Sequence, residues 1–255
     1  MAAVAFSAEG AVGTITLDHP PANSYDIQFM LDLADTIGEA SSHDAVRVVV
    51  VRSASERFFS AGADVKRFLA NDVHANMEMI ALAHDALASI ARSPKLFVAW
   101  IAGHALGGGL EIALACDLRY AAEGRFRLGT PEVTLGLLPG NGGSQRLPRL
   151  IGRGPALELL LTGRQVSPEE ALRLGLVGGL FADEEAFAAH VQRLAAGPPV
   201  ALAAIKRCVH EGAERTLEEG LALERELIEQ LFRSEDAAEG LTAFVEKRDP
   251  EFVGA

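Results

Sequence analysis

A run of β-branched residues, Val46-Arg-Val-Val-Val-Val51, constrains the fold of this chain more than any other segment. Such runs are typical of strands that are buried on both faces, as in a parallel sheet. The chain before it predicts a hairpin over residues 3–7 and 12–18, and then a helix over residues 26–42 with apolar side chains at helical spacing. A strand, a helix and a strand in this order predict a right-handed crossover.

Helices and strands continue to alternate beyond this run, although less regularly. We expect a helix over 76–91, a strand over 96–101, a helix over 107–116, and strands over 118–121 and 177–181. The last 60 residues contain only helical patterns. The sequence therefore predicts an α/β core over residues 1–195 and a helical C-terminal region over residues 196–255. Because no low-complexity linker separates them, we expect the two parts to pack together. These patterns alone favour a doubly wound sheet.

Composition narrows the possible partners and compartments. The 255 residues are 49% hydrophobic, which is enough for a large core, and the net charge of −12 disfavours nucleic acid or an anionic membrane as a partner. The most apolar stretch, residues 96–116, is interrupted by glycines, a histidine and a glutamate, so a membrane span is not expected. Cys116 and Cys208 are too few for a disulfide framework or a thiolate metal site. We expect a cytoplasmic protein without a metal centre.

Two glycine-containing turns each follow a predicted strand and precede a predicted helix. They are Phe58-Phe-Ser-Ala-Gly-Ala-Asp64 and Gly103-His-Ala-Leu-Gly-Gly-Gly-Leu-Glu111. The first N–H groups of a helix have no partner within the helix, and the helix dipole favours negative charge there. Two such junctions at one sheet edge could direct two N–H donors at one developing oxyanion. The alternative is that both are simply tight turns, and neither matches a nucleotide-binding motif.

Two carboxylates, Glu111 and Glu132, are candidates for proton transfer. Glu111 begins an apolar helix, where an unpaired charge is costly to bury, and Glu132 follows Thr130-Pro131. Glycines and a proline between them require the chain to turn back if the two are to meet. Two carboxylates in a partly apolar cleft can differ in proton affinity and act as acid and base. Each also has an ordinary interpretation as a charge in the first turn of a helix.

Ordered motifs along nearly the whole chain support one family. They are Phe59-Ser-Ala-Gly-Ala-Asp-Val-Lys66, Ala102-Gly-His-Ala-Leu-Gly-Gly-Gly-Leu-Glu111, Ala115-Cys-Asp117, Pro131-Glu-Val-Thr-Leu-Gly-Leu-Leu-Pro-Gly140, Gly142-Gly-Ser-Gln-Arg146, Leu161-Thr-Gly163 and Glu239-Gly-Leu-Thr-Ala-Phe-Val-Glu-Lys-Arg248. On these motifs the sequence resembles the crotonase, or enoyl-CoA hydratase/isomerase, superfamily. The resemblance implies an α/β spiral of ββα units, followed by a helical region used for trimerisation, with trimers often pairing into hexamers.

The resemblance also implies roles for particular residues. The backbone N–H groups of Ala63 and Gly108 match the pair that binds the thioester oxygen, and Glu111 and Glu132 match the two glutamates of the hydratases. Lys66, Phe244 and Lys247 match positions near the CoA moiety, the last two reaching a neighbouring subunit. For both lysines a solvated surface charge is the alternative. CoA belongs to the acyl-CoA substrate, so no separate cofactor is implied.

The implied reaction is hydration of a 2-enoyl-CoA to a 3-hydroxyacyl-CoA. Glu111 would deprotonate the water that attacks C3, and Glu132 would protonate C2. An isomerase that shifts the double bond, another acyl-CoA enzyme of the family, and a non-catalytic acyl-CoA-binding protein are the alternatives. Possession of both carboxylates favours hydration. Acyl-chain length and pathway are not predicted, although the helix over 71–91 is expected to border the acyl pocket by analogy with the family.

Three features depart from the family pattern or carry no predicted chemistry. Asn23-Ser-Tyr25 replaces the usual Asn-Ala-Leu type of turn, and we predict no consequence from it. The segment over 125–132 is one residue longer than in many relatives, which could shift Glu132 relative to Glu111. His104, Cys116 and Asp117 are expected to hold the fold rather than to react.

Overall fold

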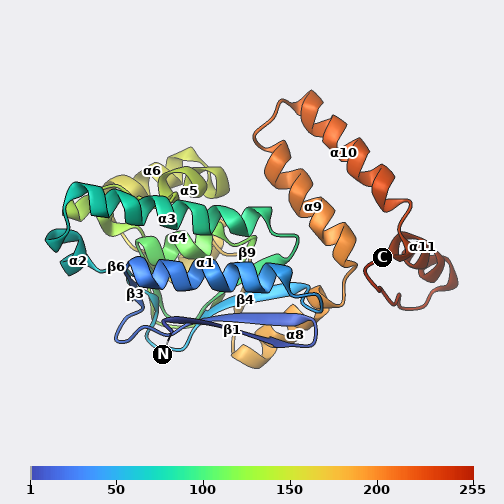
Figure 1. Ribbon diagram of the computed structural model, residues 1–255, viewed down its shortest axis with the longest axis horizontal. Coiled ribbons are helices and arrows are strands. Elements are labelled where there is room, and N and C mark those ends of the chain that lie inside the picture. Colours follow the sequence, from blue (N-terminus) through green and yellow to red (C-terminus); the bar gives the residue numbers. More distant parts are fainter. Residues whose placement is uncertain (1) are drawn as a thin grey trace.

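The computed structural model describes residues 2–255 and contains one large sheet covered by helices on both faces (Figure 1). Its six strands lie in the order β1-β2-β4-β7-β9-β11. They are β1 (Val4–Glu9), β2 (Val12–Leu17), β4 (Val48–Ser53), β7 (Leu96–Ile101), β9 (Leu118–Ala122) and β11 (Leu180–Phe181). Within the described part of this sheet, β1 and β2 pair antiparallel and the other neighbours pair parallel; β2 pairs with β4 after helix α1 (Ile27–Ser42). The predicted hairpin and the predicted parallel pairing are confirmed.

A second, smaller sheet distinguishes the fold from a doubly wound sheet. Its strands β5 (Phe58–Ser60), β8 (His104–Leu106) and β10 (Leu128–Gly129) lie in the order β10-β8-β5. Each of them follows a strand of the large sheet, so the chain makes repeated ββα turns. A third sheet pairs β3 (Ser24–Tyr25) with β6 (Gly62–Ala63). The expectation of a doubly wound sheet is wrong because these strands of two or three residues are too short to give a periodic pattern.

The valine run explains why helices cover both faces of the large sheet. Side chains of a strand alternate between its faces, and Val49 and Val51 join the main core while Val48 and Val50 join a smaller one. Helices α1 and α3 (Val73–Arg92) pack on the main-core face. Helix α8 (Glu184–Ala195) covers the other face, where Phe187 stacks on Trp100 with ring centroids 4.2 Å apart. The run is thus buried from both sides, as its composition predicts.

The remaining helices are α2 (Val65–Ala70), α4 (Gly108–Ala115), the 3₁₀ helix η1 (Pro131–Leu135), α5 (Gly143–Ile151), α6 (Arg153–Thr162), α7 (Pro168–Leu174), α9 (Pro199–Gly212), α10 (Leu217–Leu231) and α11 (Glu235–Glu246). Helix α4 is buried along its whole length. It therefore lies at the centre of the molecule, and its one charged side chain, Glu111, is a buried charge. No helix within residues 2–255 combines the length and the apolar character that crossing a membrane requires.

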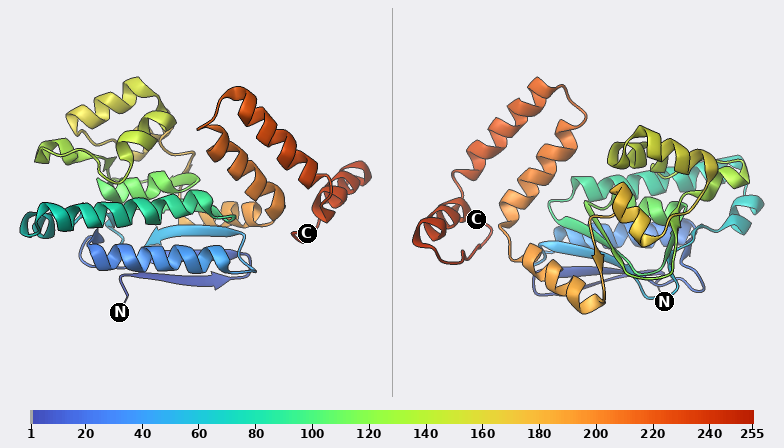
Figure 2. Two further views of the ribbon diagram at one scale, coloured as in Figure 1. Left: turned by 45° about the horizontal axis from the view of Figure 1, so that its top comes forward. Right: turned by 180° about the vertical axis from the view of Figure 1, so that it is seen from behind.

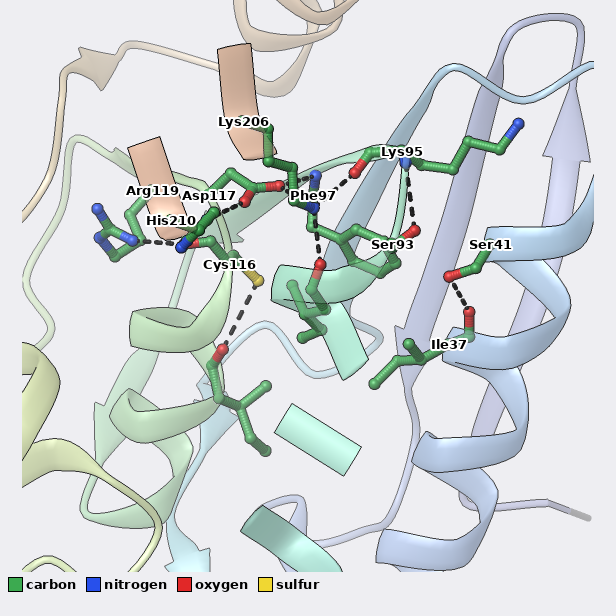
Figure 3. A network of polar contacts seen from close by, with 12 residues as sticks. Ile37, Ser41, Ser93, Lys95, Phe97, Cys116, Asp117, Arg119, Lys206 and His210 are labelled. Carbon is green, nitrogen blue, oxygen red and sulfur yellow. Dashed lines mark hydrogen bonds and ion pairs between the residues drawn. The ribbon is translucent and has the colours of Figure 1, made fainter. Parts of the chain in front are cut away.

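The C-terminal helices leave the body of the molecule. Helix α9 packs against α3 and β7. Helix α10 packs on α9, and α10 and α11 extend away from the sheet (Figure 2). The attachment of α9 includes a buried ion pair between Lys206 and Asp117, at 2.8 Å (Figure 3). Arg47 also donates a hydrogen bond to the carbonyl of Phe252 at 3.0 Å. The expected packing of the two parts is therefore found for α9, while most of α10 and α11 lies away from the core.

Candidate active site

The two glycine-containing turns meet at the ends of neighbouring elements. Ala63 ends β6, and Gly108 begins α4. Gly62 has a φ of +89°, and a Cβ there would lie 2.8 Å from the carbonyl oxygen of Leu106 and 3.1 Å from the backbone nitrogen of Gly108. Only glycine permits this approach, because Cβ contacts below 3.0 Å do not occur and positive φ is unfavourable for other residues. The backbone positions expected to donate to an oxyanion are thus side by side.

Glu111 projects from the first turn of α4 into a buried pocket of backbone donors. Its side chain is 1% exposed, and its Oε1 accepts hydrogen bonds from the backbone N–H groups of Asn141, at 2.8 Å, and Gly143, at 2.6 Å. Burial raises the pKa of Glu111 to about 7, the Gly143 hydrogen bond opposes this change, and the charge of Glu132 adds to it. Glu111 is therefore a carboxylate that can exchange a proton near neutral pH.

Glu132 reaches the same region from η1. Its Oε1 would lie 2.8 Å from a Cβ on Gly107, so glycine is required at that position to leave room for the carboxylate. Its Oε2 is buried and has no hydrogen-bond partner within residues 2–255. Burial raises the pKa of Glu132 as well. The chain does turn back between the two glutamates, and the longer segment before Glu132 does not keep it from interacting electrostatically with Glu111.

The three residues expected near CoA are not gathered at this site. Lys66 lies in the exposed helix α2, which directly follows the Ala63 turn. Phe244 and Lys247 lie at the end of α11, the helix that extends away from the sheet (Figure 2), and Phe244 is 84% exposed. Within one chain the structure therefore does not place Phe244 or Lys247 beside Glu111. Their roles, and those of the four residues above, stay predictions.

Two residues of this site were not predicted from the sequence. Tyr25 is 4% exposed, and its hydroxyl accepts a hydrogen bond from the side-chain amide of Asn141 at 2.5 Å. Asn141 is 2% exposed. The available signal was the unusual Asn23-Ser-Tyr25 turn, which places a phenol next to the glycine-containing turns.

Other polar residues singled out earlier are engaged in the fold. His104 accepts a hydrogen bond at Nδ1 from the backbone N–H of Arg127, at 3.1 Å, and Cys116 is buried. Asp117 accepts from the backbone N–H of Phe97 at 2.7 Å in addition to pairing with Lys206. Within the described residues, no three His, Cys, Asp or Glu side chains are grouped as metal ligands would be.

Comparison with known proteins shows the family of this chain. The sequence matches the enoyl-CoA hydratase/isomerase family over residues 7–255. This chain belongs to that family. A probable enoyl-CoA hydratase from Bacillus subtilis is 38% identical to this chain, and the match covers 100% of both chains. A 2,3-dehydroadipyl-CoA hydratase from Escherichia coli is 34% identical, again over the full length of both chains.

Solved structures agree with the fold of this enoyl-CoA hydratase/isomerase family member. An enoyl-CoA hydratase from Geobacillus kaustophilus superimposes with a TM-score of 0.97 at 39% identity, covering 100% of this chain and 98% of that one. An enoyl-CoA hydratase from Bacillus anthracis gives a TM-score of 0.94 at 35% identity, covering 99% and 100%. The predicted crotonase-like α/β fold with a helical C-terminal region is thus confirmed.

Proposed function

We propose that this family member is an enoyl-CoA hydratase, which adds water across the 2,3 double bond of a 2-enoyl-CoA to give a 3-hydroxyacyl-CoA. The observation that carries the proposal is a pair of carboxylates, the buried Glu111 and the half-buried Glu132, beside the junction of Ala63 and Gly108. Hydration needs a base for water and an acid for carbon, and both are present. The hydratase names of several relatives support the same reaction.

The backbone supplies the electrophilic half of the proposed mechanism. The N–H groups of Ala63 and Gly108 would donate hydrogen bonds to the thioester oxygen, so that negative charge can gather there as water attacks C3. A fixed donor of this kind contributes about 3–4 kcal/mol to transition-state stabilisation, or roughly 10²–10³ in rate. Both donors belong to main-chain positions that glycines bring together, so their geometry is set by the fold before substrate binds.

The two glutamates supply the proton transfers. Glu111, as the carboxylate, takes a proton from water while the water oxygen bonds to C3. Protonated Glu132 gives its proton to C2, and exchange with solvent returns both groups to their starting states. A pKa near 7 suits Glu111 for this work, since a base is most effective when its pKa lies near the working pH. Oε2 of Glu132, which has no hydrogen-bond partner within residues 2–255, is available to carry the transferred proton.

The proposed substrate site also suggests how copies of the chain assemble. Large apolar side chains lie exposed on the last two helices and the segment between them: Leu221, Phe232, Leu241, Phe244 and Val245. We infer that they pack against other copies in a homotrimer or a hexamer of two trimers, which would bring Phe244 and Lys247 of α11 to a neighbour's CoA site together with that neighbour's Lys66. Sedimentation velocity would reveal the assembly, and a monomer would contradict it.

The free Cys116 and Cys208 support a cytoplasmic location.

The proposal is tested by mixing the purified protein with 2-enoyl-CoA substrates of short, medium and long chain length. Loss of the conjugated enoyl absorbance, with formation of the 3-hydroxyacyl-CoA, is the expected result. Failure to turn over any chain length would reject the hydratase. Conversion of a 3-enoyl-CoA to its conjugated isomer, without any hydroxyacyl product from either substrate, would instead establish the isomerase.

A further inference from the structure

Tyr25 lies against both turns that are expected to bind the thioester oxygen. In the β3–β6 pair it is the partner of Ala63. Its ring fills the space beside Gly108, where a Cβ would lie 2.6 Å from the tyrosine Cζ. The ring also packs on Phe29, with centroids 6.3 Å apart. The phenol is therefore fixed in position by backbone pairing on one side and by core packing on the other.

The hydroxyl of Tyr25 begins a buried chain of contacts that ends at Glu111. The side-chain Nδ2 of Asn141 donates to this hydroxyl at 2.5 Å, and the backbone N–H of the same Asn141 donates to Oε1 of Glu111 at 2.8 Å. Gly143, two residues further along the same loop, provides the second donor to Oε1. The tyrosine hydroxyl thus holds the loop that carries both hydrogen bonds to this carboxylate oxygen.

Asn141 is held from two directions. Nη1 of Arg146 donates a hydrogen bond to the carbonyl oxygen of Asn141 at 2.8 Å. Within residues 2–255, the side chain of Asn141 makes its hydrogen bond to the Tyr25 hydroxyl. Arg146 belongs to α5, which begins at Gly143 and is continuous with the loop, whereas Tyr25 belongs to a separate segment and pairs with Ala63 in the β3–β6 sheet. The hydrogen bond from Asn141 to Tyr25 therefore ties the loop to the part of the site that would bind the thioester.

Tyr25 is a neutral hydroxyl when it accepts the hydrogen bond from Asn141. Burial raises its pKa, and the negative charge of Glu111 raises it further. A phenyl ring without the oxygen would fill the same core space but would leave the Asn141 amide without its acceptor. Simple packing would therefore need only the ring, while the contacts of the hydroxyl lead toward the glutamate.

We propose that Tyr25 is a positioning residue of this site, whose hydroxyl fixes Glu111 through Asn141. The inference rests on the proposed hydratase function and adds a residue to its machinery. Without the hydroxyl, the loop over 139–143 gains freedom, and the two N–H groups bind Oε1 less tightly. Misplacement of a reacting group by less than 1 Å lowers the rate substantially, so kcat should fall on the order of tenfold, with KM within about twofold.

The test compares Tyr25→Phe with Asn141→Ala, with the double variant, and with Tyr120→Phe as the matched control. Tyr120 is the other tyrosine of the chain, and its hydroxyl contacts His190 at 3.0 Å, away from the glutamates. Because the hydroxyl acts through Asn141, the double variant should be no slower than the slower single variant. Loss of the two hydrogen bonds should also move the acid limb of the kcat profile to higher pH in Tyr25→Phe but not in Tyr120→Phe.

A measurement independent of turnover separates this inference from the proposed function. Infrared titration of the buried carboxyl band, assigned by its loss in Glu111→Gln, should give a higher midpoint in Tyr25→Phe than in the parent. If no enoyl-CoA is hydrated, the proposed function fails while this titration still tests the contact. An unchanged midpoint together with an unchanged pH profile, or rate losses that multiply in the double variant, would overturn the role of Tyr25.

Discussion

The Nζ atom of Lys206 lies 2.8 Å from Oδ2 of Asp117, and both side chains are more than nine-tenths buried (Figure 3). Lys206 also donates hydrogen bonds to the carbonyls of Ile90 and Lys95, at 2.7 Å each. The ammonium of α9 is thus surrounded by acceptors from three segments of the body. Burial lowers the pKa of Lys206, and the charge of Asp117 opposes that change. This contact anchors the first helix of the C-terminal region.

Replacing Lys206 with methionine should destabilise the protein strongly, because it leaves the Asp117 carboxylate buried without its principal partner. Breaking a buried ion pair in this way costs about 3–5 kcal/mol in the free energy of unfolding, which urea denaturation measures. Arg207→Met is the matched control and should change stability little, since Arg207 pairs with Glu211 at the exposed surface of the same helix, where solvent screens the attraction. Equal losses in the two variants would contradict this role for Lys206. Adding Asp117→Asn to Lys206→Met should recover part of the loss.

How much of the fold is predictable depends on the length of each element. The valine run is almost continuously β-branched, the helix before it has a clear helical period, and both are found at the expected places. Strands β5, β8 and β10 have only two or three residues, and they form because successive turns of the chain stack on one another. The direction in which α10 leaves the body is likewise set by contacts that no local pattern reveals.

The candidate site was predictable to a similar extent. Glycines between a strand and a helix indicate close backbone approach, and the structure brings Ala63 and Gly108 together as those glycines suggest. Tyr25 and Asn141 could not be predicted as a pair. Their contact depends on the register of β3 with β6 and on the path of a distant loop, and both are tertiary features.

Replacing either glutamate with glutamine should remove most hydratase activity while preserving the fold. In Glu111→Gln the side-chain oxygen still accepts from Asn141 and Gly143, but the amide cannot take a proton from water. Loss of general acid or base catalysis costs roughly 10²–10⁴ in rate, so kcat should fall by that factor in each variant. Glu123→Gln, at an exposed position, is the control and should match the parent. Parent-like turnover by Glu111→Gln or Glu132→Gln would reject the assigned roles.

The rate should depend on pH through Glu111. Because burial raises its pKa to about 7, half of the enzyme lacks the required carboxylate near neutral pH. We therefore expect kcat/KM to rise about tenfold per pH unit below this value, and to fall again at higher pH as Glu132 loses the proton that it must give to C2. Steady-state rates measured across the range on one substrate would show the limb. An acid limb near pH 4.5, the ordinary value for a glutamate, would show that Glu111 is not the titrating base.

The same buried charge should make the protein less stable than its neutral variant at alkaline pH. The pKa of Glu111 is higher in the folded protein, about 7, than its ordinary value of 4.5, so folding favours the protonated form. The free energy of unfolding consequently falls as pH rises from 4.5 to about 7 and stays low above that range.

Since a tenfold change in proton affinity is about 1.4 kcal/mol, Glu111→Gln should exceed the parent in stability at pH 8 by about 3 kcal/mol. At pH 4, where the carboxyl is protonated in both states, the difference should vanish. Urea denaturation of both proteins at the two pH values isolates this contribution, because every other group titrates in both. A stability difference that is the same at both pH values would show that the Glu111 carboxylate is not buried at a cost.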